Sequence, residues 1–218
     1  MTVALQLETS GAGAKWEESY EELAFTAFAL GTQADDPELL ALAQEIGGVI
    51  ADWEQIETDR RRLRATAIAA RAQTRLADAA LDLALSRIAE TILAETGGNA
   101  DHDLYRRFFP QPHARVIALG LDAELPIAAA AMAQLDEGEA VSGALKGLAE
   151  TLRACLTVGN AALAARAEAY ADLGRLEARV EAWLETADAT LRNVHGDLTT
   201  IGDRRGVSYR WTAAFFTR

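Results

Sequence analysis

The sequence predicts an all-α protein, arranged as an elongated antiparallel helical hairpin or bundle. Half of the 218 residues are hydrophobic, most of these are alanine or leucine, and there are only 4 prolines. Alanine and leucine favour helix, whereas the β-branched and aromatic residues typical of strands are few. Two long apolar patterns separated by a short proline-containing region complete the prediction.

The first long helix is predicted from a heptad pattern that starts after Pro37. Apolar side chains recur at alternating steps of three and four residues, interrupted only by Arg60 and Thr74. The series is Leu39, Leu42, Ile46, Val49, Trp53, Ile56, Arg60, Leu63, Ala67, Ala70, Thr74, Ala77, Leu81, Ala84 and Ile88. Seven repeats in one register are typical of a coiled coil. Gly47-Gly48 is the weak point, where a kink or break can occur.

A shorter helix is predicted before it, over residues 15–30, preceded by an N-terminal arm over residues 1–14. One face of this helix is apolar or aromatic: Trp16, Tyr20, Leu23, Ala27 and Leu30. Asp36 followed by Pro37 is typical of a helix start, with the aspartate as N-cap and proline at the first helical position. The first helices therefore occupy residues 15–99, and the Gly97-Gly98-Asn99 sequence ends them.

Residues 100–136 are predicted to form a small helical cap. Three of the 4 prolines lie here, so the helical pieces must be short. One piece follows Asp101 or Asp103 as N-cap and carries an aromatic group, and two more flank Gly120. This cap joins the two long segments, which are therefore expected to run antiparallel.

The second long helical segment is predicted over residues 137–203. Its C-terminal part is regular, with Leu176, Val180, Trp183, Ala187, Leu191, Val194, Leu198 and Ile201 at steps of three and four. Its first part contains Gly143, Gly147 and Gly159 and can be bent. The sequence predicts one helical domain over residues 1–218.

The C-terminal tail, residues 204–218, is rich in aromatic side chains. Its first residues alternate between apolar and polar, so a short β-ribbon with residues 2–8 is one arrangement for it. An exposed aromatic cluster is an association hazard, so the tail is expected to dock on its own bundle or on a neighbouring subunit. Together with the seam arginine, the tail aromatics form the predicted protein interface: Arg60, Tyr209, Trp211, Phe215 and Phe216.

Charge and composition limit the classes of molecule that the protein is expected to bind. The chain has 33 acidic and 21 basic residues, a net charge of -12, which disfavours nucleic acid and anionic membranes. No run of 18 apolar residues occurs, so no stable membrane insertion is expected. The single cysteine, Cys155, fits a reducing compartment, and a cytoplasmic location is expected.

No catalytic motif, metal-ligand pattern or cofactor fingerprint is found, so no catalytic, metal or cofactor-binding residues are predicted. Asp101, His102 and Asp103 diverge on a helix and are interpreted as capping residues. An alternative site is a ligand pocket in the cap. It would be lined by His102, Tyr105, Arg106, Arg107 and His113.

Three functional hypotheses follow. The first is a non-catalytic helical scaffold or assembly protein that binds a protein partner or itself. The second is a helical-bundle enzyme or ligand carrier with its pocket in the cap over residues 100–136. The third is a membrane-active, toxin-like bundle, which the acidic charge disfavours. The sequence favours the first hypothesis, without enzymatic activity.

Overall fold

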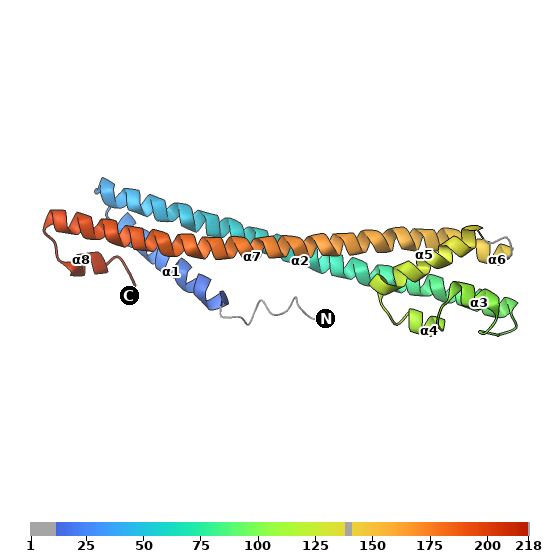
Figure 1. Ribbon diagram of the computed structural model, residues 1–218. Helices are drawn as coiled ribbons and strands as arrows, with labels where there is room; N and C mark the ends of the chain where they lie inside the picture. Colours follow the sequence, from blue (N-terminus) through green and yellow to red (C-terminus); the bar gives the residue numbers. More distant parts are fainter. Residues whose placement is uncertain (1–11, 138–140, 218) are drawn as a thin grey trace. The chain divides into compact units, whose positions relative to one another are not determined.

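The described part of the protein is predominantly helical. The structure is a computed structural model that describes residues 12–137 and 141–217 (Figure 1). Within these ranges no β-strand occurs, which confirms the all-α prediction. The elements are α1 (Ala12–Gly31), α2 (Pro37–Glu95), α3 (Asp103–Phe108), α4 (His113–Val116), α5 (Leu121–Glu137), α6 (Gly143–Lys146), α7 (Ala149–Arg205) and α8 (Tyr209–Ala213).

The chain divides into two compact units. Unit 1 contains Met1–Arg62 and Leu173–Arg218, and unit 2 contains Leu63–Asp172. The helices α2 and α7 each contribute residues to both units. The single domain predicted over residues 1–218 stays a prediction.

The heptad series of α2 forms its buried face, as predicted. Every member from Leu39 to Ile88 is buried except Arg60 and Leu63, which are half-buried. The helix continues without a break through Gly47-Gly48. The polar member Thr74 is accommodated because its hydroxyl donates a 2.9 Å hydrogen bond to the carbonyl of Ala70 in the same helix.

Three tryptophans stack in the core of unit 1. The rings of Trp16 on α1 and Trp53 on α2 have centroids 4.8 Å apart. Trp53 also packs against Trp183 on α7, at a centroid distance of 4.5 Å. Large aromatic side chains bury much apolar surface, so this stack joins all three helices of the unit.

The start of α2 and the end of α7 are joined by charged side chains. A carboxylate oxygen of Asp36 accepts the backbone N–H groups of Glu38 at 3.2 Å and Leu39 at 3.4 Å, and so caps α2. The same carboxylate pairs with Arg205. Arg205 also reaches Glu38 at 2.7 Å, and Glu38 pairs with Arg204 as well. Hydrogen bonding to Arg205 lowers the pKa of Asp36.

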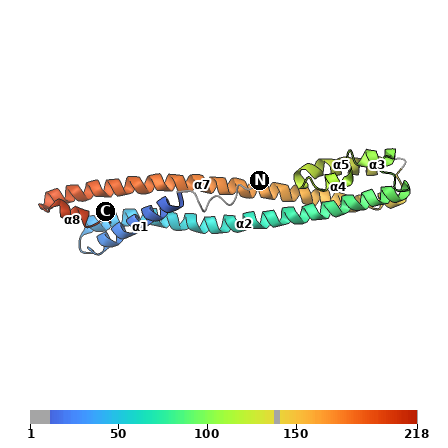
Figure 2. The same ribbon diagram turned by 90° about the horizontal axis from the view of Figure 1, so that it is seen from below.

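The residues of the predicted cap form α3, α4 and α5 in unit 2, which lie together in both views (Figure 2). Its buried side chains form one cluster with α2 and α7. The largest fully buried members are Leu81, Leu85, Ile88, Ile92, Phe108, Phe109, Leu145 and Leu152. The helices α5 and α7 approach closely at Gly159, where an added Cβ would lie 2.9 Å from Cδ2 of Leu125.

The predicted β-ribbon is not found. Its first strand, residues 2–8, lies outside the described residues, and its second is replaced by the helix α8. A helical turn brings Trp211, Thr212 and Phe215 to one side, which alternation along a strand would not do. This side packs near Gly202 of α7: an added Cβ there would lie 3.5 Å from Thr212 and 3.5 Å from Trp211.

Several boundaries also differ from the prediction. The helix α1 begins at Ala12, inside the predicted arm. The N-cap of α3 is His102 and not an aspartate, because its Nδ1 accepts the Leu104 N–H at 3.1 Å. The second long segment is interrupted between α6 and α7, next to Gly147, and regular helix runs from Ala149 to Arg205.

Candidate functional site

An apolar stripe runs along the outer face of α2 in unit 2. Its residues follow one another at steps of three and four, and all of them are exposed. The stripe, called the outer stripe below, consists of Ala65, Ile68, Ala72, Leu76, Ala79 and Leu83. Ile68 is 65% exposed, Leu76 73% and Leu83 54%. A helix face turned to solvent is ordinarily polar, so three large aliphatic side chains in one row form an unpartnered surface.

The outer stripe is exposed because the opposite face of α2 carries the buried seam. Ile68 precedes the seam residue Ala70 by two positions, which corresponds to a rotation of about 200° around the helix. The seam residues Ala67, Ala70 and Ala77 are small and buried. Packing within unit 2 therefore uses the seam and leaves the outer stripe uncovered.

Arginines accompany the outer stripe. Residues 65–83, which carry the outer stripe, contain four charged side chains: Arg71, Arg75, Asp78 and Asp82. Within unit 2, Arg71 and Arg75 are exposed and lie four residues apart, next to the aliphatic row. The first half of the outer stripe is thus flanked by arginines and suits an acidic partner, whereas Asp78 and Asp82 accompany its second half.

The outer face of α1 in unit 1 has the opposite charge. Glu17, Glu21, Phe25 and Phe28 follow one another at steps of four, four and three, and all are exposed. Phe28 is 77% exposed and Phe25 44%. This surface, called the α1 outer face below, combines two carboxylates with two aromatic rings.

Arg60, the first residue of the predicted interface, lies on the seam and is half-buried. Its guanidinium pairs with Glu57 at 2.8 Å and lies 5.7 Å from the centre of the Trp16 ring. A cation over an indole face is favourable, which explains how an arginine fits into an apolar seam.

The tail aromatics of the predicted interface pack within unit 1. Phe215 is buried, and its ring centroid lies 5.1 Å from that of Trp211. Phe216 packs against His195 of α7 at 5.3 Å. Tyr209 remains 69% exposed and is the tail aromatic most accessible to a partner.

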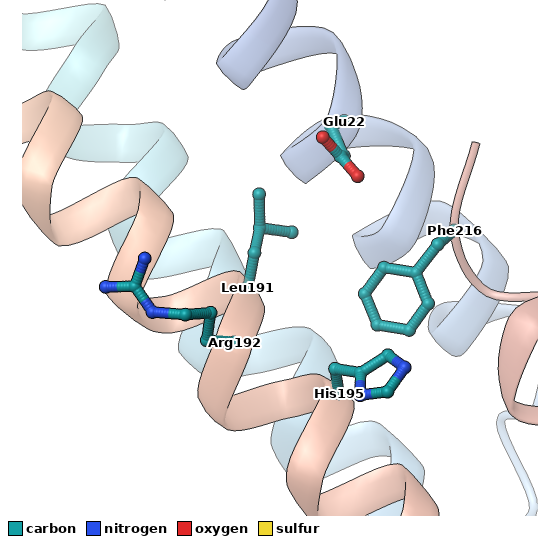
Figure 3. Close-up of a pocket in the computed structure, with 5 residues that line it drawn as sticks. All are labelled: Glu22, Leu191, Arg192, His195 and Phe216. Atoms are coloured by element: carbon teal, nitrogen blue, oxygen red, sulfur yellow. The ribbon is translucent and has the colours of Figure 1, made fainter. Parts of the chain in front are cut away.

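A shallow pocket of about 290 Å³ opens beside the tail in unit 1 (Figure 3). Its lining residues are Glu22, Leu191, Arg192, His195 and Phe216. Figure 3 shows the His195 and Phe216 rings close together and the Arg192 side chain turned away from them. The polar groups therefore do not converge on one point, as a specific small-molecule site would require.

The residues of the predicted cap pocket are divided between other contacts. Tyr105 is buried, and its hydroxyl accepts the backbone N–H of His113 at 3.1 Å. His102 caps α3, and Arg106 pairs with Asp101 at 2.7 Å. Arg107 is exposed. The structure thus brings Tyr105 and His113 together and gives His102 and Arg106 structural partners of their own.

Three carboxyl groups meet inside unit 2, which the sequence analysis missed. Glu124 on α5 is fully buried, and neither carboxyl oxygen has a hydrogen-bond partner among the described residues. Burial, followed by the nearby charge of Asp82 on α2, raises the pKa of Glu124 to about 7. The charge of Asp78 adds to this effect. Burial likewise raises the pKa of Asp82. Two of these groups therefore favour the protonated form more than isolated carboxyls do.

Known proteins offer no match to this chain: no family model, curated protein or solved structure is similar to it. Among residues 12–137 and 141–217, no three His, Cys, Asp or Glu side chains are placed to hold a metal ion. In the same ranges no helix has the length and apolarity of a membrane span. The outer stripe and the α1 outer face, in contrast, are exposed surfaces that combine apolar and charged side chains.

Proposed function

We propose that this protein is a non-catalytic helical scaffold that works through protein–protein contacts and associates with itself. The outer stripe carries the proposal. Ile68, Leu76 and Leu83 are large aliphatic side chains in one row, and each is more than half exposed. Covering such side chains contributes about 25 cal/mol per Å² of apolar surface removed from water, so a partner helix on this row would gain binding energy.

The geometry of the outer stripe suits a helical partner. Large residues alternate with Ala72 and Ala79, so the row presents projections with gaps between them. An amphipathic helix binds such a surface through anchors spaced three and four residues apart. The exposed arginines on one side of the row add charge selectivity for the partner.

The antiparallel hairpin and its coiled-coil packing belong to the same proposal. Contacts within each unit support it. In unit 1, Arg179 on α7 pairs with Asp59 on α2 at 2.8 Å, and Trp183 contacts Val49. In unit 2, the thiol of Cys155 lies 3.6 Å from the carbonyl of Ala80. Trp183 comes after Arg179 along α7, whereas its partner Val49 comes before Asp59 along α2. This is the order that antiparallel helices require.

Size-exclusion chromatography with light scattering tests the proposal. The wild-type chain is expected to have a mass above that of the monomer, and Leu76→Glu is expected to reduce it, because a buried interfacial carboxylate is unfavourable. Val158→Glu is the matched control, because Val158 is 56% exposed on α7 and lies outside the outer stripe. A wild-type chain that stays monomeric at every concentration, with Leu76→Glu unchanged from it, would falsify self-association.

A further inference from the structure

We infer that the outer stripe of one copy binds the α1 outer face of a second copy of this chain. The inference rests on the proposed self-association and adds which two surfaces meet. The outer stripe is apolar and accompanied by arginines, whereas the α1 outer face is aromatic and acidic. Among the described residues of its own unit, nothing covers either surface, since its side chains are exposed.

The apolar parts of the two surfaces are complementary in size. From Ile68 to Leu83 the outer stripe extends about 22 Å, and from Glu17 to Phe28 the α1 outer face extends about 16 Å, at 1.5 Å per residue. The shorter face therefore fits within the length of the longer one. The rings of Phe25 and Phe28 can fill the gaps that the alanines leave between the aliphatic side chains, as knobs fill holes between packed helices.

The charges are complementary in sign and in spacing. Arg71 and Arg75 are four residues apart on α2, and Glu17 and Glu21 are four residues apart on α1. All four side chains are exposed. Two helices laid side by side can thus form two Arg–Glu pairs at once. Such exposed pairs add little affinity individually, but they select the partner and its orientation.

Pairing of either surface with its own copy is less favourable. Two outer stripes related by a two-fold axis at their centre would place Arg75 of one copy beside Arg75 of the other. Two α1 outer faces laid parallel would bring four carboxylates together, and laid antiparallel they would form no Arg–Glu pair. Like charges in contact disfavour a complex, so the charge pattern favours unlike surfaces. A contact between unlike surfaces is heterologous and produces either a closed ring or an open chain of subunits.

A charge-exchange experiment tests this inference. In the first variant, Arg71→Glu and Arg75→Glu are combined. In the second variant, Glu17→Arg and Glu21→Arg are combined. Each variant alone has like charges on both surfaces, so its self-association is expected to weaken by about tenfold or more in Kd, equivalent to about 1.4 kcal/mol. Circular dichroism should show unchanged helix content, because all four substituted residues are exposed.

Mixing the two variants is the decisive step. The mixture restores opposite charges at every contact, so sedimentation is expected to show complexes that neither variant forms alone. The matched control adds Glu177→Arg and Glu181→Arg to the first variant, because these glutamates are exposed and four residues apart on α7. Mixed with the first variant, this control should restore nothing, because both proteins then carry glutamates on the outer stripe and on the α1 outer face.

The outcomes separate the inference from the proposed function. If the mixture stays monomeric while Leu76→Glu still disrupts the wild-type complex, the outer stripe mediates self-association but the α1 outer face is not its partner. If the control mixture associates as well as the matched one, the effect is general charge attraction and the inference is wrong. If the wild-type chain does not associate at all, the inference and the proposed function both fail.

Discussion

The indole Nε1 of Trp183 on α7 donates a 2.9 Å hydrogen bond to the backbone carbonyl of Val49 on α2. The ring of the same tryptophan packs on Trp53. A hydrogen bond to one carbonyl fixes the register of two helices, since the next carbonyl is displaced by about 1.5 Å along the axis and 100° around it. Apolar contacts alone would tolerate such a shift more readily.

Trp183→Phe is expected to destabilise the protein by about 1–2 kcal/mol. Phenylalanine keeps an aromatic ring in the stack but cannot donate the hydrogen bond to Val49. Denaturant unfolding followed by circular dichroism measures the change. Trp211→Phe is the comparison, because Trp211 is only half-buried in the tail. An equal loss in both variants would show that ring volume, and not the hydrogen bond, matters at Trp183.

Leu81→Ala is expected to cost about 2–5 kcal/mol of unfolding free energy, as large-to-small changes in a core do. Leu83→Ala, two residues away, is expected to cost about 0.5 kcal/mol or less. Leu81 is fully buried in unit 2, whereas Leu83 is 54% exposed on the outer stripe. The pair should be compared at a concentration where the chain is monomeric. Similar losses would mean that a further layer of the protein covers Leu83.

The same two leucines show what the sequence could and could not predict. The long, regular heptad series correctly identified the buried face of α2, because burial requires apolar side chains at every turn. The outer stripe has the same spacing of three and four, so periodicity could have revealed a second apolar face. Only the structure shows that no other described segment of unit 2 covers Ile68, Leu76 and Leu83.

The conformation of the tail and the burial of Glu124 were harder to predict from the sequence. Alternation in the tail suggested a strand, but the contact of α8 with α7 near Gly202 favours a helical turn. Glu124 was overlooked even though it lies between the apolar residues Leu121 and Ala128 on one face of α5. A carboxyl group spaced three or four residues from apolar residues on one helix face indicates that the carboxyl group is buried with them. Its neighbours Asp78 and Asp82 come from a different helix, and nothing in the sequence places them beside it.

The raised pKa of Glu124 gives a pH dependence with a definite sign. The pKa rises from 4.5 in a free side chain to about 7 in the folded protein, so the folded state holds this proton more tightly than the unfolded state. The stabilising contribution is complete below pH 4.5 and is lost as the pH rises through 7. The melting temperature should therefore fall by a few degrees as the pH rises across this range, because Glu124 loses its proton.

Glu124→Gln should remove much of that slope, because glutamine fills the same space without titrating. Asp122→Asn is the control, since Asp122 lies on the same helix but pairs with Arg166 at its exposed surface. A Glu124→Gln protein with the wild-type pH profile would assign the dependence to other groups.

Gly159→Ala is expected to destabilise unit 2 by about 1–3 kcal/mol, because the new methyl group would overlap Leu125. Gly174→Ala on the same helix should stabilise by about 1 kcal/mol through helix propensity, since nothing lies within 4 Å of its Cβ position. Adding Leu125→Ala to Gly159→Ala makes room for the methyl group. The double variant should therefore lose less than the sum of the single losses, and strict additivity would contradict the close approach.

Asp36 links the ends of two helices that are far apart in the sequence, and this has a dynamic consequence. Helix ends ordinarily fray independently, and their amide hydrogens exchange with solvent fastest. Here one carboxylate caps the first turn of α2 and also pairs with Arg205 in the last turn of α7. Glu38 also pairs with Arg204 and Arg205, so two carboxylates hold the end of α7. When Asp36→Ala and Glu38→Ala are combined, amide exchange should accelerate at residues 38–40 and at residues 203–205 together, so that the two helix ends open as one local unfolding unit.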